Sequence, residues 1–495
     1  MIDTEMNRDN LAGNRLFTRD MANILIHPAN QTALREMAIL GRAIEATGRL
    51  HCIFLVEDGG VAHMARDLEL SDLGCEVCVA DAYGRVYGSE GSERDESSDS
   101  LDGTTQRNEH KPGFAAMHTR FGVSVLAQLV AGLLKRYRQR KNIYDFLRTH
   151  NPALIVLGNN RHYGLELPLV DAARRADLPA LIVPYGYSGQ ADLAVTRSRN
   201  SLYWCGSAPY RMLKWLLRLL RPDNLFEING KNLFYYDPVE MLGLLLSRML
   251  PRRPWVLGAS GITKIAVSGS EDKDRLIERG IGSSRVVVTG MASHDLLYDG
   301  ASNRRATRDR LVLEYDLNPD RQIIIWAVHQ MAEDGNLDWE SHWREVEAIA
   351  ELLGELDAEI LASLHPKADV AAYMEHLAPK DLKVMHNELS RNLPGADVFV
   401  AGYSTTVHWA ILLGIPVFVM DFFGTGYDMY EHAGGASTVT NKLELRTSLQ
   451  KCLVEVPQEQ SGERAKTNRS SSVGVLDGQA VARLQGLVEH LAIGK

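Results

Sequence analysis

The stretch Val398-Phe399-Val400-Ala401-Gly402-Tyr403-Ser404-Thr405-Thr406 opens with a short apolar run and ends with hydroxyl side chains. A helical pattern from Val407 to Leu413 follows directly. The apolar run predicts a buried strand, the glycine permits close approach of the backbone, and the hydroxyls lie where a helix would begin. A strand, a turn and a helix in this order are typical of α/β domains, which bind ligands at the carboxyl ends of parallel strands.

Similar apolar runs alternate with helical patterns on both sides of this stretch. We expect strands at 23–27, 51–56, 75–80, 153–157, 181–183, 264–268 and 285–290, and then at 322–326, 359–363, 398–400 and 416–420. Nearly continuous apolar strands separated by helices predict parallel sheets that are covered on both faces. The sequence therefore predicts an α/β fold with two Rossmann-like, doubly wound domains that face each other across a cleft.

The predicted domain limits follow changes in composition along the chain of 495 residues. An N-terminal domain is expected at 1–298, with a flexible acidic loop at 86–112 and a helical insertion at 190–255. A polar hinge at 299–307 opens a second domain at 299–456. Residues 457–495 are expected to form a linker and a C-terminal helix.

Charge and cysteine content exclude several classes of protein. The net charge is -9, with 54 Lys and Arg against 63 Asp and Glu, so we expect no nucleic-acid partner. Five scattered cysteines fit a reducing cytosol. Cys75 and Cys78 fall in a predicted strand, where positions i and i+3 point to opposite faces, so we expect no metal there. The acidic start and the lack of a long apolar run predict neither a signal peptide nor a membrane span, and hence a cytoplasmic protein.

Polar segments follow four predicted strands of the second domain, where ligands are expected. They supply His329, then His365, Pro366 and Lys367, then Gly402, Ser404, Thr405 and Thr406, and finally Tyr430 and Glu431. A helix start carries about half a positive charge and binds phosphate, so the 402–406 loop is the strongest candidate. Two structural alternatives remain open: the hydroxyls could only cap the helix, and His329 could be a core histidine.

Three strand ends of the first domain are expected to face the same cleft. Glu57 and Asp58 follow the second strand and are candidate general bases. Candidate acceptor-binding residues follow two later strands: Asn159, Asn160, Arg161 and Tyr185. Ordinary loop roles are the alternative for all of them.

Several patterns of other enzyme classes are missing from the sequence. It contains no HExxH sequence, no P-loop, and no GxGxxG after the first strand. We therefore expect no metal and no cofactor. Two basic stretches, 210–221 and 135–141, could contact an anionic leaflet or a lipid-linked substrate, or could simply be surface helices.

From about Asn23 to Leu453, the chain resembles enzymes of the GT-B fold. It is most similar to UDP-N-acetylglucosamine 2-epimerases and to bacterial surface-polysaccharide transferases such as CDP-glycerol glycerophosphotransferase and Kdo-transferase-like proteins. Residues 264–295 look like the segment that both groups carry before the interdomain crossover, and His329 matches a nucleotide-contacting histidine of the epimerases. The His365-Pro366 pair and the 402–406 loop look like the His-Pro and Asp-Tyr-Ser-Ser elements of the polymer transferases, with Gly402 in place of aspartate.

Departures from the epimerase pattern decide between these two groups. Asn159 and Pro184 or Tyr185 stand where the epimerases carry catalytic carboxylates, and His408 and Trp409 stand where a ribose-binding glutamate is expected. The resemblance therefore implies a metal-independent transferase that moves a sugar, or a polyol phosphate, from a nucleotide-activated donor to a surface glycan or lipid-linked acceptor. A 2-epimerase-like epimerase or hydrolase, and a nucleotide-sugar-binding subunit without activity, are the alternatives.

Overall fold

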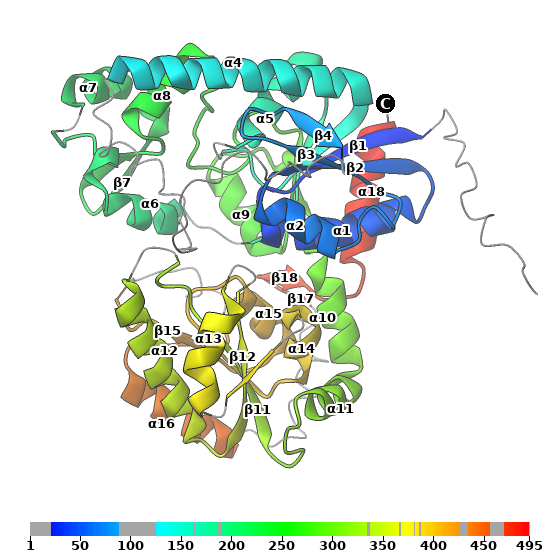
Figure 1. Ribbon diagram of the computed structural model, residues 1–495, viewed down its shortest axis with the longest axis vertical. Helices are drawn as coiled ribbons and strands as arrows, with labels where there is room; N and C mark the ends of the chain where they lie inside the picture. Colours follow the sequence, from blue (N-terminus) through cyan, green and yellow to red (C-terminus); the bar gives the residue numbers. More distant parts are fainter. Residues whose placement is uncertain are drawn as a thin grey trace, which may run out of the picture.

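The computed structural model describes residues 21–88, 125–161, 164–183, 185–186, 190–208, 210–333, 337–365, 368–380, 382–385, 388–424, 434–455 and 470–494. These residues form two lobes, each built on its own sheet (Figure 1). Most of the expected acidic loop and much of the expected linker that begins at residue 457 lie outside the described residues.

The described part of the first lobe holds an eight-stranded sheet that is parallel except for its edge strand β4. In order across the sheet the strands are β10 (Val286–Val288), β9 (Lys264–Val267), β6 (Ala180–Ile182), β5 (Pro152–Leu157), β1 (Ala22–His27), β2 (Leu50–Glu57), β3 (Glu76–Ala80) and β4 (Val86–Gly88). The antiparallel β4 lies where the sequence predicted the acidic loop to begin, so the first three residues of the predicted loop form a strand instead.

Helices cover both faces of this sheet because alternate residues of its strands point in opposite directions. Ile24 and Ile26 pack with α1 (Gln31–Glu45), α2 (Gly60–Asp67) and the C-terminal α18 (Ala480–Ile493). Leu25 packs with α4 (Val125–His150), α5 (Glu166–Ala176) and α9 (Ser270–Glu278). As the sequence predicted, Cys75 and Cys78 point to opposite faces of the sheet: Cys75 lies on the first face and Cys78 on the second.

The insertion between β6 and β9 is only partly helical. It contains α6 (Gln190–Ser198), α7 (Arg211–Leu220) and α8 (Pro238–Leu246), but also the antiparallel hairpin of β7 (Leu225–Ile228) and β8 (Lys231–Phe234). The sequence analysis missed this hairpin, whose strands have only four residues each. Its buried aromatic residues join α6, α7 and α8 in a small core of their own.

The second lobe holds a six-stranded, fully parallel sheet in its described residues. In order the strands are β13 (Lys383–Val384), β12 (Ala358–Ser363), β11 (Gln322–Ala327), β14 (Val398–Ala401), β15 (Val417–Met420) and β16 (Ala436–Val439). The helices that cover it are α10 (Ser293–Ser302), α11 (Arg304–Glu314), α12 (Trp339–Gly354), α13 (Val370–Leu377), α14 (Leu389–Asn392), α15 (Thr406–Leu413) and α16 (Lys442–Glu455).

The chain crosses between the lobes twice. The expected hinge at 299–307 lies instead in α10 and α11, and Leu297 of α10 is already buried in the second core. The return crossing carries the short hairpin β17 (Ser470–Ser471) and β18 (Gly474–Val475). Part of the expected linker is therefore a folded hairpin, because Val473 and Leu476 are buried against the second lobe. Beyond it, Leu484 and Val488 of α18 are fully buried against the first lobe.

Candidate functional site between the lobes

The strand ends of the second lobe place the predicted donor residues side by side. Strands β12, β11, β14 and β15 are consecutive neighbours and parallel, so their carboxyl ends share one edge of the sheet. His365 follows β12, His329 follows β11, and the 402–406 loop follows β14. A Cβ added at Gly402 would lie 3.3 Å from the Cβ of His329, so these two segments touch.

The 402–406 loop leads directly into α15, as the sequence predicted. The hydroxyl oxygens of Ser404 and Thr406 are 2.8 Å apart, and Ser404 Oγ accepts a 3.3 Å hydrogen bond from the Thr406 N–H group. Ser404 therefore satisfies part of the helix start, as the capping alternative requires. Thr405 precedes α15 without making a side-chain capping bond. The loop can cap its own helix and still present Thr405 to another partner.

His329 is enclosed and uncharged at neutral pH. Burial, together with the charges of His342 and Lys442, lowers its pKa to about 4. The rings of His329 and His342 meet edge to face at 5.7 Å between their centroids. Its Nε2 atom has no hydrogen-bond partner among the residues that the structure describes. His329 can therefore offer a ligand a hydrogen bond, but not the positive charge assumed from sequence.

A pocket joins this edge of the second lobe to the first lobe. From the second lobe it is lined by Thr405, His408 and Trp409; from the first it is lined by residues that include Arg161, Gly186, Asp272, Arg275 and Arg279. A Cβ added at Gly186 would lie 3.4 Å from Thr405 Oγ1, so the two lobes meet at the loop. Burial raises the pKa of Asp272 to about 6. The pocket thus has three arginines and the start of α15 among its lining residues, and Arg275 is already paired with Glu271.

Three ionisable side chains meet at the carboxyl edge of the first sheet, and we call them the His27 cluster: His27, Glu57 and Glu166. They end β1, end β2 and begin α5, respectively, and their ligand atoms all lie within 4.8 Å of one another. His27 is fully buried, with Nδ1 2.8 Å from the Leu55 carbonyl oxygen and Nε2 4.0 Å from a Glu166 oxygen. Glu57 accepts a 2.9 Å hydrogen bond from the Leu165 N–H group.

The electrostatics of the His27 cluster favour the protonated form of the imidazole. Burial by itself lowers the pKa of His27, but the hydrogen bond and charge of Glu166 and the charge of Glu57 outweigh it, so the net shift is upward. An imidazole between two carboxylates can take up or release a proton near neutral pH. The same donor set of one imidazole and two carboxylates could also hold a divalent cation.

Of the site residues predicted in the first lobe, some face the His27 cluster and others do not. Glu57 points into the His27 cluster, whereas Asp58 is exposed and accepts a hydrogen bond from its neighbour, the Gly59 N–H group. Asn160 is fully buried and bonds the Ser260 carbonyl oxygen and the Gly258 N–H group, so its side chain holds the fold together.

Asn159 and Tyr185 lie close to the His27 cluster. Asn159 Oδ1 accepts hydrogen bonds from Arg161 N at 2.9 Å and from Arg161 Nε at 3.3 Å. Burial and the charge of Glu166 raise the pKa of Tyr185, which therefore stays protonated, and its side chain is within hydrogen-bonding reach of Asn30 and Asn159. Tyr185 thus lies near Glu166 and Asn159, and Asn159 is bonded to Arg161, which lines the pocket.

Four of the predicted donor residues lie outside the described part of the chain: Pro366, Lys367, Tyr430 and Glu431. Their assignment stays a prediction. Conversely, the sequence analysis overlooked His27, Glu166 and the α9 arginines. His27 carried a usable signal, because it is a polar residue at the end of the first predicted strand. Glu166 opens a helix and carries no such signal in sequence alone.

No protein-family model matches the chain, and no curated protein matches it by sequence. Solved structures do match it across nearly its whole length. A UDP-N-acetylglucosamine 2-epimerase from Listeria monocytogenes, described as putative in its title, superposes with a TM-score of 0.52 at 14% identity, covering 96% of this chain and 98% of that one. The enzyme from Neisseria meningitidis bound to UDP-GlcNAc gives 0.51 at 12%, covering 94% and 99%.

CalG4, a calicheamicin glycosyltransferase, superposes with a TM-score of 0.50 at 14% identity, covering 95% of this chain and 98% of its own. At such identities the likeness shows the fold. It agrees with the resemblance found in the sequence and with the two parallel sheets described above. The chain has the GT-B fold, in which two Rossmann-like domains face each other across a ligand-binding cleft.

Proposed function

We propose that this chain is a metal-independent GT-B glycosyltransferase. It would move a sugar, or a polyol phosphate, from a nucleotide-activated donor to a cell-surface glycan or lipid-linked acceptor. The observation that carries this proposal is the meeting of Thr405, at the start of α15, with Gly186 of the opposite lobe in a pocket that also holds three arginines. A helix start facing a basic pocket suits the phosphates of a nucleotide donor.

In this proposal the second lobe binds the donor. The N–H groups and hydroxyls of the 402–406 loop, with Arg275 and Arg279, would stabilise the negative charge that grows on the departing phosphate. Positioned donors of this kind each contribute on the order of 3–4 kcal/mol to transition-state stabilisation. His329 would add a hydrogen bond to the donor. His365, which follows the neighbouring strand, would also contact the donor. Two of the similar structures hold UDP or UDP-GlcNAc, according to their titles, which supports a nucleotide-sugar donor.

The first lobe would bind the acceptor and remove its proton. Of the two predicted bases, we favour Glu57, because it shares the His27 cluster with a histidine and a second carboxylate. The acceptor hydroxyl would lose its proton to the Glu57 carboxylate as its oxygen attacks the donor, and the donor's phosphate group would depart. Asn159, Arg161 and Tyr185 would orient the acceptor.

A nucleotide-sugar epimerase or hydrolase is the alternative that the cluster also supports. Asn159 and Tyr185 cannot carry protons as carboxylates do near neutral pH, but Glu57 and Glu166 lie close to them. An epimerase could use those two acids instead. The two functions differ in one requirement, because a transferase releases free nucleotide only when an acceptor is present.

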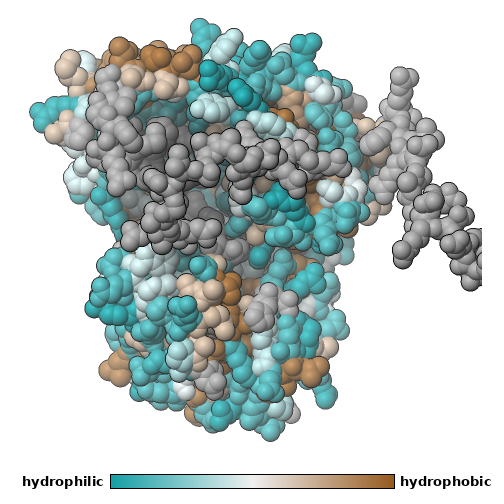
Figure 2. All heavy atoms as spheres, in the orientation of Figure 1, coloured by the Kyte–Doolittle hydropathy of each residue, from teal (hydrophilic) through white to brown (hydrophobic). Residues whose placement is uncertain are grey.

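Helix α7 supports the membrane part of the proposal. Met212, Trp215 and Leu219 are 87%, 64% and 60% exposed and lie on one helical face, while Lys214 is fully buried against the Ser201 carbonyl oxygen. Of the cations in this basic stretch, Arg211 and Arg218 are exposed, whereas Lys214 is buried. Helix α7 lies beside the start of α4 at the upper left of Figure 1, and Figure 2 shows an apolar patch over this part of the molecule.

An exposed apolar face rimmed by cations fits the surface of an anionic bilayer. No helix in the described ranges is long and apolar enough to cross a membrane. Flotation with vesicles that contain phosphatidylglycerol tests the contact. The double variant Trp215→Glu, Leu219→Glu should stay at the bottom of the gradient, and equal flotation of both proteins would contradict the contact.

The proposed transfer is tested in two steps. First, a thermal-shift panel of CMP, CDP, UDP, GDP and ADP identifies the nucleotide that raises the melting temperature. The matching donor is then incubated with and without a bacterial lipid and glycan extract. Free nucleotide that appears only with the extract supports transfer, whereas mixed sugar epimers without it support the epimerase. If none of the five nucleotides raises the melting temperature, both the transferase and the epimerase proposals are contradicted.

A further inference from the structure

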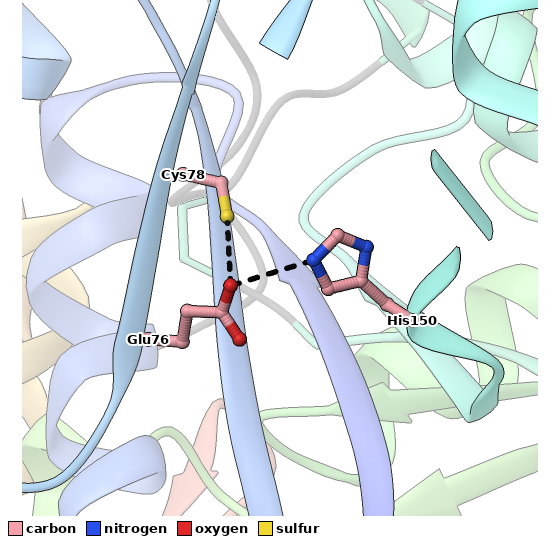
Figure 3. A group of neighbouring side chains, drawn as sticks. All are labelled: Glu76, Cys78 and His150. Atoms are coloured by element: carbon pink, nitrogen blue, oxygen red, sulfur yellow. Dashed lines mark hydrogen bonds and ion pairs between the residues drawn. The ribbon is translucent and has the colours of Figure 1, made fainter. Parts of the chain in front are cut away.

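The edge of the first sheet opposite the cleft carries a second group of ligand-type side chains, which we call the edge cluster: Glu76, Cys78 and His150. Glu76 and Cys78 lie two residues apart on one face of β3, and His150 ends α4 (Figure 3). Their ligand atoms all lie within 4.8 Å of one another. The three residues come from two elements that are far apart in the chain, so the fold has brought them together.

The distances between these atoms fit the tetrahedral coordination of a metal ion. Glu76 Oε1 is 3.4 Å from His150 Nε2 and 3.4 Å from Cys78 Sγ. Bond lengths of ~2.0–2.3 Å to a tetrahedral zinc ion place neighbouring ligand atoms about 3.3–3.6 Å apart. An ion could therefore enter between these side chains with little movement of the backbone.

The tautomer of His150 gives a second, independent argument. Its Nδ1 atom is 3.0 Å from the Phe146 carbonyl oxygen, so Nδ1 must carry a proton and donate it. In a neutral ring the lone pair of Nε2 then faces the Glu76 carboxylate, which is repulsive. Either a second proton or a cation must lie between the two atoms. The ring is held in this orientation by Phe146, whose centroid lies 4.1 Å away.

Two further side chains, His51 and Glu45, hold the Glu76 carboxylate in place. His51 Nε2 is 3.8 Å from Glu76 Oε2, and His51 Nδ1 is 3.0 Å from Glu45 Oε1. Glu45 in turn accepts a hydrogen bond from the Cys52 N–H group. Metal ligands in proteins are usually oriented by such outer hydrogen bonds, which fix both the tautomer and the direction of the lone pair.

We propose that Cys78, His150 and Glu76 bind a zinc ion, with His51 as a positioning residue for Glu76 and water in the fourth position. Thiolate, imidazole and carboxylate are the ligand types that zinc prefers, and the two anionic ligands balance its charge. Glu76 is the most exposed of the three, which leaves the ion an entry path. The site lies at the amino ends of β2 and β3, away from the cleft, so its role would be to fasten α4 to the sheet, independent of transfer.

The experiment uses the full chain, stripped with EDTA and dialysed. Zinc alone should bind with a stoichiometry of one, measured by calorimetry and elemental analysis, and should raise the melting temperature. Cobalt(II) should give the thiolate-to-metal absorption band and the intense visible bands of a tetrahedral site. Glu76→Gln, a change at a partly exposed position, should weaken zinc binding at least about tenfold, and Cys78→Ser should abolish the thiolate band.

Cys452→Ser is the matched control, because Cys452 is a buried cysteine in α16 of the other lobe. It should keep both zinc affinity and the cobalt spectrum. No zinc binding by the stripped protein would overturn the proposal. Binding that survives unchanged in both Glu76→Gln and Cys78→Ser would overturn it as well, since the ion would then lie elsewhere, for example in the His27 cluster. Glu76→Gln keeps the test valid should Cys78→Ser fail to fold.

Discussion

The two lobes build their halves of the cleft in different ways. In the second lobe, Thr405, His408 and Trp409 lie within five consecutive residues around the start of α15 and line the pocket that meets the other lobe. In the first lobe, His27, Glu57 and Glu166 come from three separate elements and meet only because the sheet places their strands together. A phosphate-binding loop can thus be predicted from a short stretch of sequence. A cluster that transfers protons can be recognised only once the order of the strands in the sheet is known.

The largest effect is expected in the first lobe. Glu166→Gln removes the carboxylate that pairs with His27, so the turnover number should fall about 100- to 10,000-fold while donor affinity stays within threefold. Initial rates and calorimetry with the donor found in the nucleotide panel measure both quantities. His27→Gln should behave similarly.

Asp58→Asn distinguishes the two carboxylates that the sequence nominated. Asp58 is exposed and bonded to the backbone beside it, so this variant should lose less than threefold in turnover. If it instead loses as much as Glu166→Gln, the base is the exposed residue, and the His27 cluster has a structural role only.

A smaller effect is expected in the second lobe. Gly402→Ala places a methyl group 3.3 Å from the Cβ of His329, which must shift by a few tenths of an ångström. Donor affinity should fall about tenfold, and the turnover number at saturation should change little. Gly354→Ala is the matched control, since its added Cβ would lie 3.6 Å from the nearest atom. Equal affinities in the two variants would show that His329 does not border the donor.

The contrast between the lobes also explains how far the sequence could be interpreted. The strands of both sheets were predictable because buried parallel strands are almost continuously apolar, and the loop before α15 was predictable because its residues are adjacent. The hairpins β7–β8 and β17–β18 were not, because strands of two to four residues give too short a pattern. The His27 cluster required the strand order, in which β5 and β2 flank β1. No local pattern carries that order.

The last prediction concerns stability, at the junction that holds the two lobes together. Glu36 of α1 is buried and accepts a 2.9 Å hydrogen bond from the Ser293 N–H group at the start of α10. Burial raises its pKa to about 7 from the usual 4.5. The folded state therefore binds this proton more tightly than the unfolded state, and its contribution to stability falls as pH rises from 4.5 to 7.

The loss amounts to about 3 kcal/mol across that window, since one pKa unit corresponds to about 1.4 kcal/mol. Glu36→Gln keeps an acceptor for Ser293 but cannot ionise, so the melting temperature of the wild type should drop several degrees more than that of the variant between pH 5 and pH 7.5. Other groups titrate equally in both proteins, and the difference between the two curves isolates Glu36. Parallel curves would mean that the carboxylate reaches water, and that the crossover between the lobes is looser than its hydrogen bonds indicate.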